Sequence, residues 1–155
     1  MSEEKPGSKT LAVNRRARYD YSVEDRLECG ISLSGTEVKS IKAGKFSFSD
    51  SYAKIDEGHL VLAGFHISPY AYGNLNNHDP DRNRILLAHK KEIKRLSRKV
   101  DERGYTLIPL RVYLKRGLVK IELGICLGKK HKDKRDAIKA RDVKRDIERE
   151  FRGRL

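Results

Sequence analysis

The chain has 155 residues, of which 37% are hydrophobic and 37% are charged, a composition that suffices for one compact domain with extensions. Its 35 Lys and Arg against 22 Asp and Glu give a formal net charge of +13, which favours a polyanionic partner, and nucleic acid rather than a membrane surface. No apolar run approaches the ~20 residues of a membrane-spanning helix, and residues 1–10 hold no hydrophobic signal region, so we expect a cytoplasmic protein.

Residues 1–13 are predicted to be a flexible leader, and a long strand is predicted over residues 19–33. Apolar or aromatic side chains occupy most odd positions of this segment, whereas charged and polar side chains occupy most even positions. Such alternation is typical of a strand with one buried face. Asp25 breaks the alternation, and Gly30 indicates a bulge or bend, as expected where a strand curves around a small barrel.

Residues 35–45 are predicted to form a short helix with Thr36 as its N-cap. Strand patterns then occupy residues 46–55 and 59–67, and a tight turn joins them. The polar residues 68–84 form a loop that is too long for a simple connection, so we expect it to take part in function.

The pattern of residues 85–100 predicts a short strand that leads into a helix, with Gly104 at the helix end. Residues 106–115 and 118–127 predict a final hairpin with a two-residue turn. Pro109 has no backbone N–H, so it belongs at a sheet edge or at a bulge.

Together these segments predict a mainly β fold of about six strands with two or three inserted helices. Strands and helices do not alternate regularly, which argues against a parallel sheet. The prediction is an OB-fold-like closed antiparallel β-barrel that binds RNA over residues 14–127, followed by a basic C-terminal tail over residues 128–155.

The tail holds twelve Lys and Arg against six Asp and Glu, and its apolar residues form a stripe only one residue wide. Opposite charges three and four residues apart support helicity by tenths of a kcal/mol per pair. An isolated helix is marginal in water, and the stripe is too thin to dock firmly on the barrel. We therefore expect the tail to be disordered in the free protein and helical against RNA.

Candidate catalytic and metal-binding groups do not cluster in the sequence. The histidines are scattered, and Cys29 and Cys126 lie far apart without a Cys-x-x-Cys pair, which predicts two buried thiols and no zinc site. Residues 79–81 (Asp-Pro-Asp) are typical of a turn rather than of a metal-dependent nuclease. Glu37 is expected to cap a helix N-terminus rather than to act as a general base. No enzymatic activity, metal or cofactor is expected.

Basic residues gather in several segments. A solvated charged face explains any one segment, but acidic residues do not balance the whole set. Guanidinium groups pair with phosphate in a fork geometry that suits an RNA backbone. Tyr70 and Tyr72 can offer stacking surfaces to unpaired bases, as can Tyr19 and Tyr21 if these are not core residues. The basic residues in question are Arg15, Arg16, Arg18, Lys39, Lys42, Lys45, Arg82, Arg84, Lys90, Lys91, Lys94, Arg95, Arg98 and Lys99.

Several motifs occur together: NRRARYDY at residues 14–21, GTEVKS-x-x-AGK at 35–45, SDSY at 49–52 and GKK-x-x-DKR at 128–135. In order and spacing, these motifs and the stretches between them resemble the SmpB (small protein B) family, bacterial partners of transfer-messenger RNA (tmRNA). The resemblance covers residues 14–150.

The resemblance implies an oligonucleotide-binding barrel that is not an enzyme. Such a protein binds the tRNA-like domain of tmRNA, supports its charging with alanine and is delivered with elongation factor Tu and GTP to stalled ribosomes. The tail is then expected to enter the empty mRNA channel as a helix near the decoding centre. This process is trans-translation.

The resemblance also implies particular site residues. Tail residues Lys132 and Val143 depart from the family pattern, which often has an aromatic group or His near these places. The family's RNA-binding positions fall on Glu28, Leu87 and His89, with Asn14, Arg15, Arg16, Arg18, Lys39, Lys42, Arg82, Arg84 and Lys90 around them. The expected ribosome contacts of the tail are Lys129, Lys130, His131, Lys132, Asp133, Lys134 and Arg135.

Two other functions remain open at the level of sequence. A basic barrel protein that binds rRNA or tRNA as a permanent part of the ribosome has the same charge. An RNA-processing nuclease requires a metal site, for which Asp79 is the candidate ligand.

Overall fold

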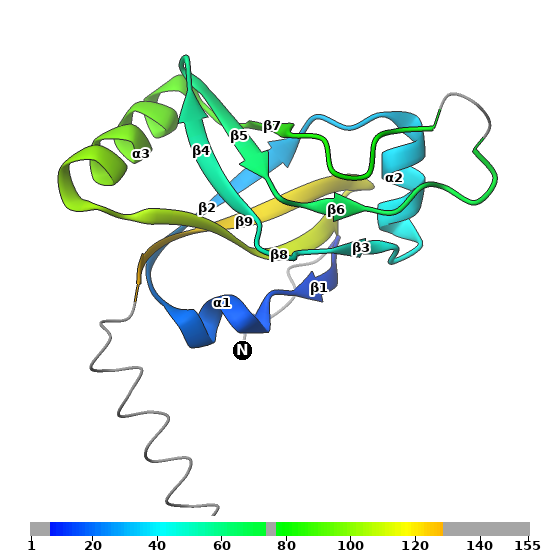
Figure 1. The fold of residues 1–155 in the computed structure, drawn as a ribbon, viewed down its shortest axis with the longest axis horizontal. Helices are drawn as coiled ribbons and strands as arrows, with labels where there is room; N and C mark the ends of the chain where they lie inside the picture. Colours follow the sequence, from blue (N-terminus) through cyan, green and yellow to red (C-terminus); the bar gives the residue numbers. More distant parts are fainter. Residues whose placement is uncertain (1–6, 74–76, 129–155) are drawn as a thin grey trace, which may run out of the picture.

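The computed structural model of the protein describes residues 7–73 and 77–128. Within this part, nine strands and three helices follow one another along the chain (Figure 1). The strands are β1 (Ser8–Val13), β2 (Tyr21–Ile31), β3 (Phe46–Ser47), β4 (Tyr52–Asp56), β5 (His59–Ala63), β6 (His66–Ile67), β7 (Arg84–Leu87), β8 (Thr106–Lys115) and β9 (Leu118–Gly128). The helices are α1 (Arg15–Asp20), α2 (Gly35–Lys42) and α3 (Lys90–Arg103).

Six strands form a ring of antiparallel pairs. Neighbours pair in the order β8, β4, β5, β7, β2 and β9, and β9 pairs back with β8. Strand β1 extends the sheet by pairing with β8, and β3 pairs with β6 in a separate two-stranded sheet. The prediction of a mainly β fold of about six strands with two or three helices is confirmed, and the six strands close into a ring.

The core fills the inside of this ring. Leu60, Leu62, Ile121 and Leu123 are fully buried there, and each such side chain contributes roughly 1.5–3 kcal/mol through burial. Helices α2 and α3 lie at opposite ends of the long axis of the molecule in Figure 1. Both helices pack on the core, because Ile41 of α2 and Leu96 of α3 belong to the same buried cluster, together with further residues of the ring.

The N-terminal segment departs from its prediction. The flexible leader over residues 1–13 is wrong for residues 8–13, which form β1 and pair with β8, with a register shift between Thr10 and Ala12. This pairing satisfies backbone groups along the β8 edge, and the N–H of Arg116 also donates to the carbonyl of Gly7 at 3.1 Å. Residues 1–6 lie outside the described part.

The predicted strand start at residue 19 is also wrong, because residues 15–20 form α1. Asn14 caps this helix: its side-chain oxygen accepts the N–H of Ala17 at 3.2 Å. Ala17 is buried at 3% exposure and anchors the helix on the sheet. Strand β2 therefore begins only at Tyr21.

The predicted irregularities of the sheet are mostly confirmed. The register of β2 shifts between Val23 and Asp25, and that of β8 shifts between Pro109 and Arg111. The predicted bulge or bend at Gly30 is not a bulge, because no register shift falls there within the described pairs of β2. Gly30 instead allows a close approach, since a Cβ at this position would lie 3.2 Å from the Cβ of Leu87.

Two hairpins turn as their sequences predict. Glu57 and Gly58 connect β4 to β5 with φ of 50° and 78°, and Arg116 and Gly117 connect β8 to β9 with φ of 52° and 80°. Positive φ at both central residues matches the twist of the flanking strands. Gly104 ends α3 in the left-handed conformation, also as predicted.

Candidate nucleic-acid interface

A groove of about 490 Å³ opens on the outer face of the ring, where β2, β7, β9 and the start of α3 meet. Gly30 of β2 is paired with both Leu87 of β7 and Lys120 of β9. Because Gly30 has no side chain, the floor of the groove is open between its neighbours. The lining residues are Glu28, Gly30, Leu87, Ala88, His89, Glu92 and Lys120. The structure thus brings together Glu28, Leu87 and His89, which the family resemblance singled out.

Strand alternation places two of these residues outward. Cys29 is fully buried, whereas the side chain of its neighbour Glu28 is 43% exposed. Leu86 is 2% exposed, whereas Leu87 is 56% exposed. An exposed leucine beside an exposed carboxylate provides one apolar contact and one polar contact side by side.

The carboxylate of Glu28 is oriented by two donors from β8. The hydroxyl of Tyr113 donates to it at 2.5 Å, and the ammonium of Lys115 donates at 3.1 Å. The hydrogen bond from Tyr113 lowers the pKa of Glu28, and Lys115 acts in the same direction, while desolvation opposes them. Glu28 is therefore an anion at neutral pH. A carboxylate in this state can accept hydrogen bonds from base amino groups or from a ribose hydroxyl.

Arg111, which lies two residues before Tyr113 on β8, supports this arrangement. Its guanidinium lies 4.2 Å from the centre of the Tyr113 ring, and it donates to Glu122 at 2.9 Å. Arg26 of β2 donates to the same carboxylate of Glu122 at 3.0 Å. Arg111 also donates to the hydroxyl of Thr10 at 2.9 Å, which links β1 to the network.

Sequence reasoning missed several residues of this network, namely Tyr113, Lys115 and Lys120. Strand alternation in β8 and β9 was a usable signal for their outward direction. Their proximity to Glu28 depends on strand pairing through β9, for which the sequence offers no local signal.

Arg84 does not contact solvent, so its prediction as an RNA-binding residue is wrong. Its side chain is 0% exposed and forms an ion pair with Glu37, whose side chain is also 0% exposed. The Nε of Arg84 donates to Glu37 at 2.6 Å, and its Nη1 donates to the carbonyl of Phe65 at 2.5 Å. Arg82, which is 37% exposed, binds the other oxygen of Glu37 at 2.5 Å. These two arginines tie residues 79–84 to Glu37 of α2.

Glu37 also caps α2, as predicted, but the N-cap residue is Ser34 rather than Thr36. The N–H of Ser34 donates to Glu37 at 2.9 Å. Burial alone would raise the pKa of Glu37, yet the hydrogen bonds from Arg82, Ser34 and Arg84 outweigh it and lower the pKa to about 2. The carboxylate therefore forms its hydrogen bonds within the protein and is not accessible to a ligand.

Asn14 has a structural role, and its role as an RNA-binding residue stays a prediction. It is 9% exposed, and both ends of its amide are used within the protein. Its nitrogen donates to the carbonyl of Pro109 at 2.9 Å, and its oxygen caps α1. The exposed cations of this region are Arg15, Arg16 and Arg18, which lie on α1 rather than on a strand.

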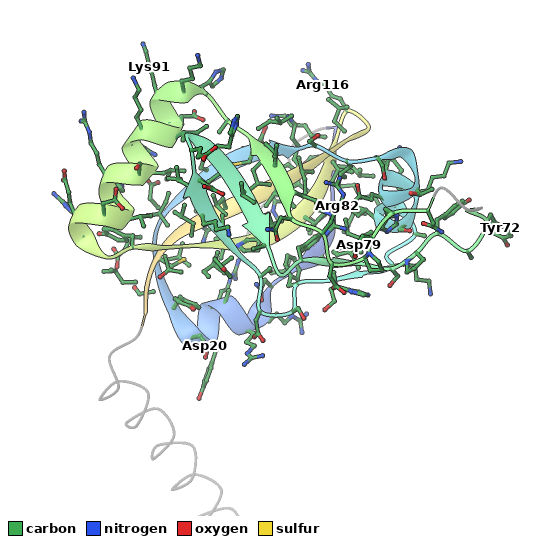
Figure 2. The ribbon with its side chains drawn as sticks, turned by 45° about the horizontal axis from the view of Figure 1, so that its top comes forward. Asp20, Tyr72, Asp79, Arg82, Lys91 and Arg116 are labelled. Carbon is green, nitrogen blue, oxygen red and sulfur yellow. The ribbon has the colours of Figure 1, made fainter. Side chains whose placement is uncertain are left out.

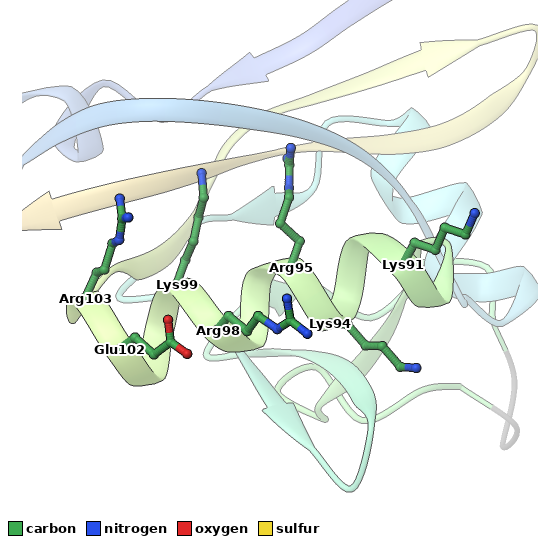
Figure 3. Close-up of a pocket in the computed structure, with 7 residues that line it drawn as sticks. All are labelled: Lys91, Lys94, Arg95, Arg98, Lys99, Glu102 and Arg103. Carbon is green, nitrogen blue, oxygen red and sulfur yellow. The ribbon is translucent and has the colours of Figure 1, made fainter.

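Helix α3 carries seven Lys and Arg, most of which Figure 3 shows. Its exposed first residue, Lys90, follows directly after His89 at the groove. A row of cations four residues apart points to one side of the helix: Lys91, Arg95, Lys99 and Arg103. Asp25 of β2 pairs with two of them, Arg95 at 3.3 Å and Lys99 at 3.6 Å. A shallow hollow of about 420 Å³ runs along this helix.

On its other side, the groove continues towards α2. A second hollow of about 200 Å³ shares Gly30, Leu87 and Lys120 with the groove and reaches Val38 of α2. The exposed residues Lys39 and Lys42 lie on the same helix. The cations of α2 and α3 therefore flank the groove at its two ends, an arrangement suited to a polyanion lying across it.

The remaining predicted contacts lie outside the described residues. These are Lys129, Lys130, His131, Lys132, Asp133, Lys134 and Arg135 of the tail. Asp79 accepts the N–H of Asp81 at 3.0 Å in a turn, as predicted for residues 79–81. Among the described residues, no helix is long and apolar enough to cross a membrane.

Comparison with known proteins gives a consistent result over nearly the whole chain. A family model described as SmpB protein matches residues 11–153. An SsrA-binding protein of Ruminiclostridium cellulolyticum is 54% identical over 151 residues, which are 97% of this chain and 98% of that protein. An SsrA-binding protein of Treponema denticola is 52% identical over 149 residues, with 96% of this chain and 97% of that protein covered.

A solved structure has the same fold. Its chain, described by the words "tmRNA-SmpB: a journey to the center of the bacterial ribosome", superposes with a TM-score of 0.67 and 45% sequence identity. The superposition covers 82% of this chain and 93% of that chain.

Proposed function

This chain belongs to the SmpB family, and from that premise we propose that it binds tmRNA and acts with it on stalled ribosomes in trans-translation. The matched relatives are SsrA-binding proteins, and the matched structure is of SmpB with tmRNA and the bacterial ribosome.

The groove on the outer face is the proposed contact with the tRNA-like domain of tmRNA. The single observation that carries this assignment is the convergence of Glu28, Leu87 and His89 on one hollow, although β2 and β7 are far apart in sequence. The oriented carboxylate of Glu28 accepts from a base or ribose donor, and Leu87 packs on an apolar part of the same nucleotide. Lys120 and Lys90 neutralise the phosphates on either side.

The tail over residues 128–155 has a separate proposed role. Its excess of Lys and Arg suits the rRNA walls of the empty mRNA channel, where it reports to the decoding centre that no message is present. The RNA-bound groove and the tail then act in sequence: the first delivers tmRNA, together with elongation factor Tu and GTP, and the second licenses its acceptance. This role consists of binding steps and requires no reaction catalysed by this chain, so we infer a binding protein rather than an enzyme.

Two variants separate these roles. Glu28→Arg places a cation where the carboxylate accepts from RNA, so we expect at least about 30-fold weaker binding of the tRNA-like domain, in line with losing a charged hydrogen bond of roughly 2 kcal/mol or more. A chain that ends at Gly128 should bind the same RNA within about threefold but should add no peptide tag on stalled ribosomes. Filter binding measures the first effect, and a cell-free tagging assay measures the second.

The matched control is Glu24→Arg, which makes the same charge change on an exposed residue of the same strand. Normal RNA binding by Glu24→Arg, together with an unchanged melting temperature of Glu28→Arg, would assign the loss to the groove. Equal losses in both variants would instead mean that only net charge matters, and the groove assignment would fail.

A further inference from the structure

A cluster of aromatic and basic side chains lies at the α2 end of the molecule, and its aromatic residues, Tyr70 and Tyr72, do not line the groove. Tyr72 is 84% exposed, the highest exposure of any large apolar or aromatic side chain in the described residues. Figure 2 shows it at the outer end of the loop, projecting away from the body. A tyrosine ring that is exposed in this way can offer its face to a planar ligand such as a nucleotide base.

Tyr72 is held by a neighbouring ring rather than left on a loose loop. Its ring lies 5.7 Å from that of Tyr70, centre to centre, in an edge-on arrangement with an angle of 65°. The ammonium of Lys39 on α2 lies 5.3 Å from the centre of the Tyr70 ring. Tyr72 thus contacts Tyr70, and Tyr70 in turn contacts Lys39 of α2.

The backbone beneath these rings is clamped by Asn77. Its side-chain nitrogen donates to the carbonyl of Tyr70 at 2.9 Å, and its oxygen accepts the N–H of Tyr70 at 3.2 Å. The N–H of Gly73 closes a turn on the same carbonyl at 2.9 Å. A Cβ at Gly73 would lie 2.6 Å from the Asn77 nitrogen, so only glycine leaves room for this clamp. The geometry of Tyr72 is therefore largely set before any partner binds.

The base of the loop is tied to α2 as well. His78 accepts from or donates to the hydroxyl of Thr36 at 2.9 Å, and its Nε2 lies 2.9 Å from the carbonyl of Ile67. Since a carbonyl can only accept, Nε2 carries a proton, and in the neutral ring Nδ1 accepts from Thr36. The N–H of Ser68 donates to the carbonyl of Lys45 at 2.9 Å.

The charge around the cluster is positive. Lys39, Lys42 and Lys45 are exposed on α2 and its exit, whereas Glu37, the acid of this helix, is buried. Of the loop acids, Asp81 pairs with His66 at 2.7 Å and Asp79 caps its own turn. An exposed aromatic ring beside several cations is the combination that binds an unpaired nucleotide, with the base on the ring and the phosphate on the cations.

We propose that Tyr72 is a stacking surface for an unpaired RNA base, that Lys39 and Lys42 hold the adjoining phosphates, and that Asn77 positions the ring. This site rests on the proposed RNA-binding function and extends it: the groove receives structured RNA, and the Tyr72 site receives a base that is outside a helix. Stacking tolerates any base, so the site selects for an unpaired state rather than for a sequence.

The chain contains no tryptophan, so Tyr72→Trp in the full-length protein gives a single indole emitter at the site. We expect its fluorescence to be quenched by an eight-nucleotide oligoadenylate and by the tRNA-like domain of tmRNA, but not by a blunt RNA duplex without unpaired bases. The matched control is Tyr52→Trp on β4, at a tyrosine that is 43% exposed. Its fluorescence should be quenched neither by the oligoadenylate nor by the tRNA-like domain.

Affinities complete the test. Tyr72→Ala should bind the oligoadenylate roughly tenfold more weakly, whereas Tyr72→Phe, which keeps the ring, should bind within twofold of the unsubstituted protein. Asn77→Ala should weaken binding severalfold while the indole at position 72 is still quenched at saturation, as a positioning role requires. Normal binding by Tyr72→Ala, equal quenching by the blunt duplex, or quenching by ribosomal proteins but by no RNA would each overturn the proposal. If the unsubstituted protein failed to bind the tRNA-like domain at all, the proposed function would fail instead.

Discussion

Two glutamates of this protein have similar partners and opposite surroundings. Glu28 accepts hydrogen bonds from Tyr113 and Lys115 on the outer face, where its side chain is 43% exposed. Glu37 accepts from Arg82, Arg84 and the N–H of Ser34 with its side chain 0% exposed. Both have lowered pKa values. An oriented anion can therefore recognise a ligand only where the ligand can still reach it. A buried anion with similar partners instead stabilises the fold.

The largest expected effect concerns the buried member of this pair. Glu37→Gln leaves the guanidinium of Arg84 buried without a counter-charge, which typically costs about 3–5 kcal/mol. We expect the free energy of unfolding to fall by roughly this amount in urea denaturation. The exposed counterpart, Glu28→Gln, should lose less than about 1 kcal/mol of unfolding free energy. Its amide oxygen can still accept from Tyr113, and water can solvate the other polar groups around it. Similar losses of unfolding free energy in the two variants would contradict this distinction between the buried and the exposed glutamate.

Acid should act on the same cluster with a defined sign. Glu37 has a pKa of about 2 when folded against an ordinary value of 4.5. As the pH falls below about 4.5, the unfolded chain takes up this proton first, so stability is lost between roughly pH 4.5 and pH 2 and is constant above that window for this group. We expect a loss of about 3 kcal/mol across the window.

A series of urea titrations from pH 6 to pH 2 measures this loss. The Glu37→Gln variant has no proton to take up at this position, so its stability should depend less steeply on pH than that of the unsubstituted protein. Parallel pH profiles of the two proteins would show that Glu37 is not the group responsible.

The smallest effect concerns the orientation of Glu28. Tyr113→Phe removes the first donor to this carboxylate, so the pKa of Glu28 should rise towards its ordinary value while the ring contact with Arg111 stays. At neutral pH the carboxylate is still ionised, and we expect RNA binding to weaken by only about two- to fivefold. NMR titration of the Glu28 carboxyl carbon checks the pKa. An unchanged pKa would mean that Lys115 alone sets the state of Glu28.

Features set by neighbouring residues were predictable from the sequence. The turns at Gly58 and Gly117, the bulge after Pro109 and the helix end at Gly104 depend on local backbone preferences, and all were correctly predicted. Alternation along β2 also placed Glu28 outward correctly.

Features that depend on distant pairing were not predictable in the same way. Tyr113 reaches Glu28 only because β9 lies between β8 and β2 in the sheet. Arg84 shares the inward parity of Leu86 on β7, yet the apolar neighbours Ile85 and Leu87 point outward, so the hydrophobic pattern hid which face was buried. A buried arginine makes sense only with Glu37, which lies 47 residues away along the chain.

The N-terminal errors have a related cause. Residues 8–13 carry a weak strand pattern and become a strand by pairing with β8. The alternating pattern around Tyr19 suggested a strand, but the cap at Asn14 and the burial of Ala17 make this segment a helix instead. Tertiary contacts outweigh local propensity in such short segments.

The central claim is that the groove beside Glu28 holds tmRNA, and a single reactive thiol in the groove tests it most directly. Burial raises the pKa of Cys29 to about 12 and that of Cys126 to about 11, so neither native thiol should react readily. Leu87→Cys adds one exposed thiol at the groove, and Tyr52→Cys adds one on β4 as the control.

The measurement is the rate of thiol alkylation with and without the tRNA-like domain of tmRNA at saturation. We expect the RNA to slow alkylation of the Leu87→Cys protein at least tenfold and to leave that of the Tyr52→Cys protein unchanged. Alkylation of the groove thiol at the same rate with bound RNA as without it would contradict the account.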